Sequence, residues 1–471
     1  MRKINKIKGM LWTVLFCLSG SGFCLSACGM QKEYVPAIVD GVNTNPGDYR
    51  FSSIMKGEAG YYYQPSSRDF NFHYYDIASG NNVYLCNRPE CLHQGDEFCT
   101  ATSTRYLENG STMYDGKIYI TAYDTEKEEG LDYVLLRLEP DGSNLTQLAV
   151  LKSFTSVERG ILVSPEVFIH RGKCISSFAY STEDRFLLGT IIYDLVSGEI
   201  TELPTYEFES SLDGYYSASF DIRDRFMGKE DYIYYNETRP KELNGKKSKT
   251  YLCRYNILDG TTEEAELSCL YKGGYTVTEA DQCVLSDKFG NLYTYNWKDK
   301  TEEQNPKTHA VRTVYREDGT MEQEIFPFSP ADIFYYKGHL FGLDGIHMYG
   351  QNSSSFIPGE KKPYGENLFL GIYMFDENME QHIDLDADFS PYYIGPEIYD
   401  SVIEDAKDEM DIEMDYPGGK MLGLMARLSL VEDVLYLQTD VAVYGWNMDE
   451  FLEGKGQFTR LYSIRGLSDG E

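Results

Sequence analysis

Residues 193–198 read Tyr-Asp-Leu-Val-Ser-Gly, and the run that follows them ends on Leu203. Residues 75–80, Tyr-Asp-Ile-Ala-Ser-Gly, have the same pattern and lead to Leu85. A strand that ends in Tyr-Asp, a tight polar turn and a return strand closed by leucine together indicate an antiparallel β-hairpin. Weaker copies occur at residues 138–142, 255–260, 315–319, 375–378 and 462–470. The chain therefore repeats one kind of hairpin along its length.

A second element alternates with these hairpins. It is a glycine or acidic turn that leads into a short hydrophobic, tyrosine-rich strand, as in residues 115–120, Asp-Gly-Lys-Ile-Tyr-Ile. Its seven copies lie near Gly60, Gly116, Gly172, Asp231, Gly290, Gly338 and Asp433. Most copies are about 55 to 63 residues apart, which suits a four-stranded antiparallel blade. The alternation predicts an all-β chain folded as a β-propeller with seven four-stranded blades. Six or eight blades, or a pair of β-sandwiches, are the alternatives.

The predicted propeller occupies residues 46–471 and is interrupted once. Between Phe375 and Asp433 the period is broken by an insertion at about 386–425, in which Ser401 begins an acidic, helix-like segment. The last copy reaches residue 470 with one residue left. We therefore expect the N-terminal segment 34–39 to supply the final strand of the last blade, because only closure of the ring protects its edges.

The first 27 residues are typical of an export signal. A basic start is followed by the apolar run 10–16 and by small residues, and residues 25–28 read Leu-Ser-Ala-Cys. This segment resembles the signals of bacterial lipoproteins, in which the residue at the position of Cys28 carries a thioether-linked diacylglycerol. The resemblance implies that residues 1–27 are a signal peptide and that residues 28–45 are a lipidated tether. It also implies a protein held at the extracytoplasmic face of the cell membrane, since two acyl chains give stable anchoring.

The charge of the chain excludes some partners. The formal net charge is −32, and it becomes −36 without residues 1–27, which contain four basic residues and no acidic ones. Nucleic acids and anionic membrane surfaces attract basic proteins, so we expect neither as a partner. After the signal no second long apolar segment follows, so we expect no membrane-spanning helix.

The number of cysteines limits disulfide formation. The chain has ten, of which Cys17 and Cys24 lie in the signal and Cys28 is the expected lipid attachment site. Seven remain, and an odd number cannot all pair with one another. A fully disulfide-stapled scaffold is therefore excluded.

Four candidate metal ligands lie in one short segment. Residues 86–99 read CNRPECLHQGDEFC and contain Cys86, Cys91, His93 and Cys99. Three thiolates and one imidazole are a complete tetrahedral set for a structural zinc ion, with no position left open for catalysis. The spacing C-x4-C-x-H-x5-C differs from that of a zinc finger, so one disulfide with a spare thiol, or unlinked side chains, are the alternatives. Zinc or a disulfide would staple the loop between the first two blades.

The same segment carries a family resemblance. A tyrosine-rich hairpin followed by Leu-Cys-Asn-x-Pro-x-Cys-x-His and a third cysteine resembles a set of uncharacterised β-propeller lipoproteins of Gram-positive anaerobes. The resemblance covers the signal, the first unit and the repeat pattern, and it implies a fold and a location but no activity. A more distant likeness to TolB-type propellers rests on fold alone.

The sequence lacks the motifs of common enzyme classes. It contains no phosphate-binding glycine motif and no H-E-x-x-H helix, and its one G-x-S-x-G string, residues 466–470, falls in the last predicted hairpin turn and not in a strand-to-helix elbow. We therefore expect a lipid-anchored propeller that binds a ligand or partner protein without catalysis, with structural zinc as its single cofactor. One alternative is a surface glycosidase or lyase built from scattered loop carboxylates, and another is an assembly or structural component of the envelope. Trp297 and Trp446 are candidates for sugar stacking or for core packing.

Overall fold

The computed structural model describes most of the chain between residues 55 and 463. These residues all belong to one unit, which spans Ile38–Glu471. The described ranges are 55–64, 72–94, 99–103, 105–126, 130–154, 167–181, 185–209, 223–240, 248–268, 271–278, 280–287, 292–305, 309–315, 321–327, 332–348, 368–375, 382–384, 415–416, 419–420, 427–431, 433–438, 442–456 and 459–463.

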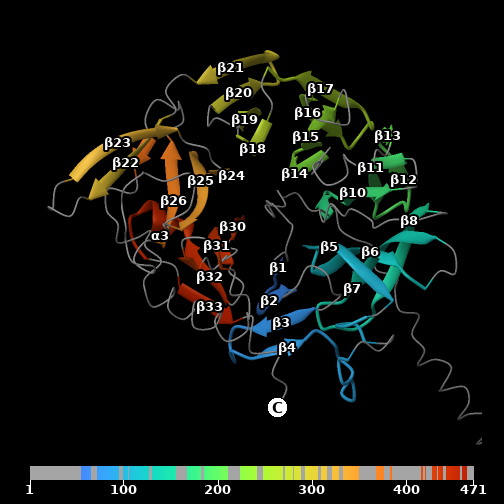
Figure 1. Ribbon diagram of the computed structural model, residues 1–471. Helices are drawn as coiled ribbons and strands as arrows, with labels where there is room; N and C mark the ends of the chain where they lie inside the picture. The colour runs from blue at the N-terminus through green and yellow to red at the C-terminus, as the bar shows by residue number, and fades with distance from the viewer. Residues whose placement is uncertain are drawn as a thin grey trace, which may run out of the picture. The chain divides into compact units, whose positions relative to one another are not determined.

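Seven sheets among the described residues each contain four antiparallel strands in chain order (Figure 1). The first two sheets consist of β1 (Met55–Lys56), β2 (Gly60–Tyr63), β3 (His73–Asp76) and β4 (Asn82–Tyr84), and of β5 (Tyr106–Tyr114), β6 (Lys117–Asp124), β7 (Leu131–Leu138) and β8 (Thr146–Phe154). The third and fourth consist of β9 (Val167–His170), β10 (Lys173–Ser181), β11 (Arg185–Asp194) and β12 (Ile200–Glu202), with β13 (Tyr206–Glu209) also paired to β11, and of β14 (Arg223–Lys229), β15 (Tyr232–Pro240), β16 (Ser248–Asn256) and β17 (Thr262–Glu266).

The last three sheets follow the same plan. They consist of β18 (Tyr271–Val277), β19 (Gln282–Asp287), β20 (Leu292–Asn296) and β21 (Thr301–Asn305), of β24 (Asp332–Tyr336), β25 (His339–Met348), β26 (Leu368–Phe375) and β27 (His382–Asp384), and of β30 (Arg427–Val431), β31 (Val434–Gln438), β32 (Ala442–Asn447) and β33 (Thr459–Ser463). The predicted β-propeller with seven four-stranded blades is confirmed.

The hairpins that define the repeat are closed by a recurring set of hydrogen bonds. In the third sheet, the Asp194 carboxylate accepts the Val196 N–H at 2.8 Å, and the Asp194 carbonyl accepts the Gly198 N–H at 2.8 Å. Gly198 has a φ of +73°, a conformation that favours glycine. The Leu195 N–H donates to the Gly172 carbonyl at 2.9 Å, which joins this hairpin to the first turn of the same sheet. Equivalent bonds close the hairpins at residues 76–80 and 256–260.

The leucines that end the return strands pack between consecutive sheets. Leu85, Leu203 and Leu267 are buried, and each lies in a core formed with the next sheet along the chain. Burying such a side chain stabilises the fold by about 1.5–3 kcal/mol. The closing leucines expected at Leu85 and Leu203 are therefore found in the core, and Leu267 takes the same place after the 255–260 hairpin.

The first and last sheets also pack against each other. Tyr61 and Tyr63 in β2 share a buried cluster with Tyr436 in β31 and Val443 in β32. The rings of Tyr61 and Tyr436 meet edge-on, with their centroids 5.8 Å apart. We refer to the contact formed by these four residues as the seam, because it joins the beginning of the propeller to its end.

The predicted repeat is wrong in detail at the fifth sheet. It places the first turn of this sheet at Gly290, which lies outside the described residues and between β19 and β20. The observed turn between β18 and β19 ends at Asp281, which adopts a φ of +58° without being glycine. The predicted hairpin at 315–319 instead connects β22 (His309–Tyr315) to β23 (Met321–Pro327), a separate two-stranded sheet.

The last sheet does not require a strand from the N-terminal segment. Its four strands all come from residues 427–463, and Tyr462, which the prediction places before a final turn, lies in the fourth strand, β33. Residues 34–39 lie outside the described part of the chain. The helix α3 (Met448–Leu452) joins β32 to β33, and the side chain of Asn447 caps it.

The insertion predicted at 386–425 lies between β27 and β30. Its described part is the hairpin of β28 (Asp415–Tyr416) and β29 (Gly419–Lys420). The helix expected from Ser401 falls outside the described residues. Within the described residues, no helix is both long and apolar enough to cross a membrane.

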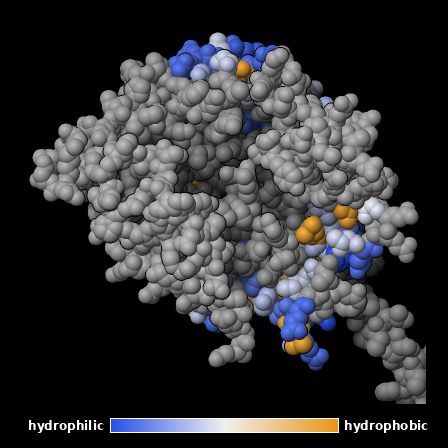
Figure 2. All heavy atoms as spheres, in the orientation of Figure 1, coloured by the Kyte–Doolittle hydropathy of each residue, from blue (hydrophilic) through white to orange (hydrophobic). Residues whose placement is uncertain are grey.

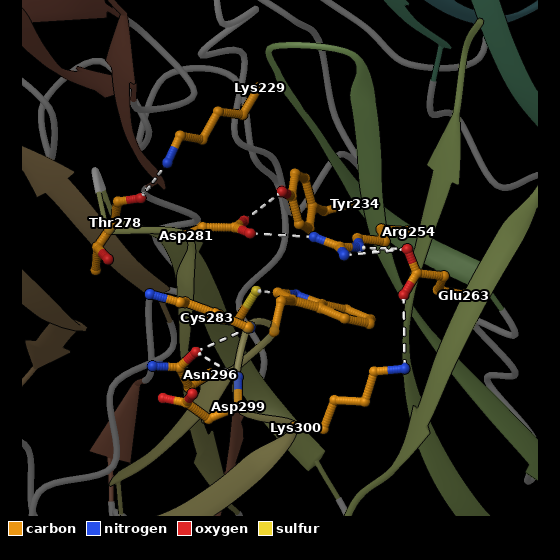
Figure 3. Close-up of polar contacts among 12 residues, drawn as sticks. Lys229, Tyr234, Arg254, Glu263, Thr278, Asp281, Cys283, Asn296, Asp299 and Lys300 are labelled. Atoms are coloured by element: carbon orange, nitrogen blue, oxygen red, sulfur yellow. Dashed lines mark hydrogen bonds and ion pairs between the residues drawn. The ribbon is translucent and has the colours of Figure 1, made fainter.

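Arg254 forms the centre of a charged contact between the fourth and fifth sheets (Figure 3). Its guanidinium lies between the rings of Tyr232 and Trp297, 4.4 and 4.5 Å from their centroids. It also donates to Asp281 at 3.1 Å and to Glu263 at 3.0 Å. Only 11% of its side chain is exposed, so this charge depends on both carboxylates and both rings.

Hydrophobic side chains on the described surface are scattered. The coloured residues on the face shown in Figure 2 are mostly hydrophilic, with hydrophobic ones in small groups. Ile77, Val196 and Leu258 are each more than half exposed at the tips of three separate hairpins. Single exposed residues of this kind are ordinary on protein surfaces, so we assign no docking surface to them.

Candidate metal centre

The loop that carries the candidate ligands is fixed at both ends by one buried residue. The Leu85 N–H donates to the Phe72 carbonyl at 2.9 Å, and the Phe72 N–H donates to the Ala101 carbonyl at 2.9 Å. Phe72, Leu85 and Ala101 are all buried. Residues 86–100 therefore leave and re-enter the structure at neighbouring points, which brings the two ends of the loop together.

The four predicted ligands do meet in space. One ligand atom from each of Cys86, Cys91, His93 and Cys99 lies within 4.8 Å of every other. Cys99 is buried and the other three are partly exposed. Among the described residues, this is the one cluster of at least three cysteine, histidine or acidic side chains with an arrangement that could hold a metal ion.

The spacing of the four side chains is compatible with a tetrahedral zinc site. Zinc lies about 2.3 Å from sulfur and about 2.0–2.1 Å from nitrogen, so a sulfur and a nitrogen on the same ion are about 3.6 Å apart. His93 Nδ1 and Cys99 Sγ are 3.5 Å apart. Two sulfurs on one zinc ion are about 3.8 Å apart, which lies within the 4.8 Å limit. The residues present therefore fit zinc in number, chemistry and spacing.

Backbone N–H groups point at two of the sulfurs. The Thr102 N–H donates to Cys99 Sγ at 3.3 Å. Burial raises the pKa of Cys86, but hydrogen bonds from the Arg88 N–H, from Thr100 and from Cys91 outweigh it, so the pKa of the Cys86 thiol is lowered. Donors of this kind stabilise a thiolate, and the thiolate is the form of cysteine that binds metal. None of the six described cysteines forms a disulfide.

The position of His93 is set by a column of rings. His93 stacks on Tyr84 with centroids 4.6 Å apart, and Tyr84 packs on His73 at 4.5 Å. His73 in turn stacks on Tyr63 at 5.6 Å. The column follows strand register, because Tyr63 pairs with His73 across β2 and β3, and His73 pairs with Tyr84 across β3 and β4. His93 has a φ of +52°, an unfavourable conformation for a residue other than glycine that its surroundings must maintain.

A second contact fixes the loop to the next sheet. The Thr100 hydroxyl lies 2.6 Å from the Gly142 carbonyl and 3.2 Å from the Leu85 carbonyl. A Cβ atom at Gly142 would lie 2.7 Å from the Cys86 nitrogen, so only glycine permits this approach. The loop thus bridges the first sheet and the β7–β8 hairpin of the second.

The sequence indicates the four candidate ligands but not the residues that support them. Tyr84, His73 and Thr100 carry no motif that marks them, because their contacts depend on strand register and on the second sheet. Cys28, the predicted lipidation site, lies outside the described residues. The other described cysteines are buried away from the cluster, at Cys174, Cys253 and Cys283.

The tryptophans are packing residues. Trp297 and Trp446 are each 2% exposed. The Trp297 ring NH donates to Cys283 Sγ, and the Trp446 ring NH donates to the Lys455 carbonyl. Neither ring is available for sugar stacking, so of the two interpretations offered by the sequence core packing is correct.

No protein-family model and no curated protein matches the chain. Among solved structures it is similar to the polysaccharide lyase Uly1, with 10% identity over 91% of this chain and 91% of that chain and a TM-score of 0.39. It is also similar to the Dos1 propeller, with 9% identity over 93% of this chain and 88% of that chain and a TM-score of 0.35. The β-propeller domain of the trilobed protease from Pyrococcus furiosus gives 10% identity, coverage of 76% and 85%, and a TM-score of 0.36. At these identities and TM-scores the comparisons assign no function.

Proposed function

We propose that this protein is a lipid-anchored extracytoplasmic β-propeller that binds a ligand or partner protein without catalysis, and that a structural zinc ion closes its first inter-sheet loop. The observation that carries the proposal is the Cys86, Cys91, His93 and Cys99 cluster, whose ligand atoms all lie within 4.8 Å of one another. Four protein ligands leave no coordination position for a substrate or reactive water. The metal therefore serves to hold the loop in place, and binding belongs to the rest of the propeller.

The zinc part of the proposal is tested by metal analysis of the full chain purified in detergent. We expect close to one zinc ion per chain. His93→Ala should lose most of it, because three ligands bind zinc more weakly than four. Cys174→Ala removes a buried thiol outside the cluster and is the matched control, which should keep its zinc. If the purified chain contains no metal and its mass is two hydrogens lower than that of the chain with free thiols, a disulfide is present in place of zinc.

The anchor is supported by the residues before and at Cys28, and its test is independent of the metal. In the native host, Cys28→Ala should abolish lipid labelling and leave either unprocessed precursor or protein released from the membrane. Ser26→Ala, two positions earlier, keeps the cysteine and should leave the anchor intact. Lipid labelling that persists in Cys28→Ala would contradict the anchor.

Crosslinking in native membranes would identify the binding partner. The proteins recovered with the full chain are compared with those recovered with the Cys28→Ala form. One dominant protein recovered only with the anchored form would identify an envelope assembly component. Recovery of the same protein with both forms would indicate binding by the propeller itself. Turnover of a glycan by the purified chain would contradict the non-catalytic proposal and favour the glycosidase or lyase alternative.

A further inference from the structure

The first sheet is the smallest of the seven. Its strands contain two, four, four and three residues, whereas those of the second sheet contain nine, eight, eight and nine. A short ladder supplies few backbone hydrogen bonds and a small sheet buries little apolar surface of its own. The first sheet must therefore be held in place mainly by its neighbours and by the loop that follows it.

This sheet forms one side of the seam. Tyr61 and Tyr63 in β2 pack against Tyr436 and Val443 of the last sheet. In a propeller the contact between the first and last sheets is the one that no continuous chain enforces, since all other neighbours follow each other in sequence. The least extensive sheet thus forms the contact on which closure depends.

The candidate metal centre is connected to the seam through rings in direct contact. His93 stacks on Tyr84, Tyr84 packs on His73, and His73 stacks on Tyr63, which is itself a seam residue. The Asn82 side chain also donates to the Tyr63 hydroxyl, so Tyr63 is held by the strand next to the metal loop. The column crosses β4, β3 and β2 in order, from the ligand loop to the last sheet.

We infer that the metal acts as a clamp on the seam. Binding at the four ligands fixes the His93 ring against Tyr84, and the column transmits this constraint through His73 to Tyr63. Without metal the ligand loop loosens, the first sheet loses one of its external supports and the seam opens more often. This inference rests on the proposed zinc site, and it assigns to the metal a role at a contact formed by the last sheet, far from the ligands in sequence.

The test is hydrogen exchange of the full chain in detergent, with zinc bound and after removal of zinc by a chelator. Removal should speed exchange by about tenfold in β2 to β4 and also in β31 and β32. Exchange in β15 and β16, in the fourth sheet, should not change. Faster exchange across all sheets would show general destabilisation and would overturn the clamp. Unchanged exchange in β31 and β32, in a chain that binds zinc at one ion per chain, would overturn the clamp while leaving the zinc site valid. A chain that binds no zinc would overturn both.

Tyr84 provides a second test, because it is a positioning residue and not a ligand. Tyr84→Ala interrupts the column, so removal of zinc should then alter exchange in the ligand loop but no longer in β31 and β32. Tyr84→Phe keeps the ring and should behave as the unaltered chain. Each variant is analysed for zinc content before exchange is measured. If Tyr84→Ala binds zinc and still transmits its removal to the last sheet, the column is not the route.

Discussion

Replacing His73 with phenylalanine should stabilise the protein at pH 7. His73 is 1% exposed, and neither of its ring nitrogens has a hydrogen-bond partner among the described residues. A buried polar group without a partner costs about 1–3 kcal/mol. Phenylalanine removes this cost and keeps a ring between Tyr63 and Tyr84, so the gain at pH 7 should be about 1–2 kcal/mol.

The gain should grow as the pH falls. Burial, and secondarily the charge of His93, lowers the pKa of His73 from 6.5 to about 4. The unfolded chain therefore takes up a proton at this residue before the folded chain does. The stability associated with neutral His73 is complete above pH 6.5 and is lost as the pH falls toward 4. At pH 5 the loss is roughly 2 kcal/mol, and phenylalanine does not incur it.

The assay compares urea unfolding of the two proteins at pH 7 and pH 5 in excess zinc, so that protonation of the metal ligands affects both alike. His170→Phe is the matched control, because His170 is also buried but donates to the Glu230 carbonyl at 2.7 Å. That variant should be destabilised at pH 7. If His73→Phe is less stable than the unaltered chain at pH 7, or if its advantage is equal at the two pH values, the reasoning from unpartnered nitrogens and burial is refuted.

Three further predictions concern other sites. Arg254→Met should lower the free energy of unfolding by about 2–3 kcal/mol, because Asp281 and Glu263 both lose a largely buried cationic partner. Lys249→Met, at an exposed ion pair, should change it little, and equal losses would argue against the inter-sheet contact. Gly228→Ala should cost about 3 kcal/mol, since its Cβ would lie 2.2 Å from the His170 ring, and adding His170→Ala should recover part of the loss in the same urea assay. Burial raises the pKa of Cys283 to about 12, so this thiol should resist iodoacetamide at pH 8 until urea is added; equal labelling rates in folded and unfolded protein, measured by mass spectrometry, would contradict its burial.

Much of the fold could be predicted because its signals are local. The Asp194 to Gly198 hairpin is closed by bonds within five residues, so its residue types alone mark it. The fifth sheet was missed for the opposite reason. Asp281 takes the left-handed conformation that the pattern assigned to glycine, and its carboxylate then binds Tyr234 and Arg254 of the fourth sheet. That contact between sheets compensates for the backbone strain at Asp281. The residues near Asp281 in the sequence do not predict it.

The residues of the candidate metal centre divide in the same way, into those with a local signal and those that depend on distant strands. Its four candidate ligands lie within fourteen consecutive residues, so the sequence alone shows which side chains could bind a metal. The supporting rings come from three strands, and they meet only because Tyr63 pairs with His73 and His73 with Tyr84. A shift of one residue in either pairing would turn His73 to the opposite face and break the column. The ligand set alone therefore implies a loop staple, whereas strand register connects that staple to the closing contact of the propeller.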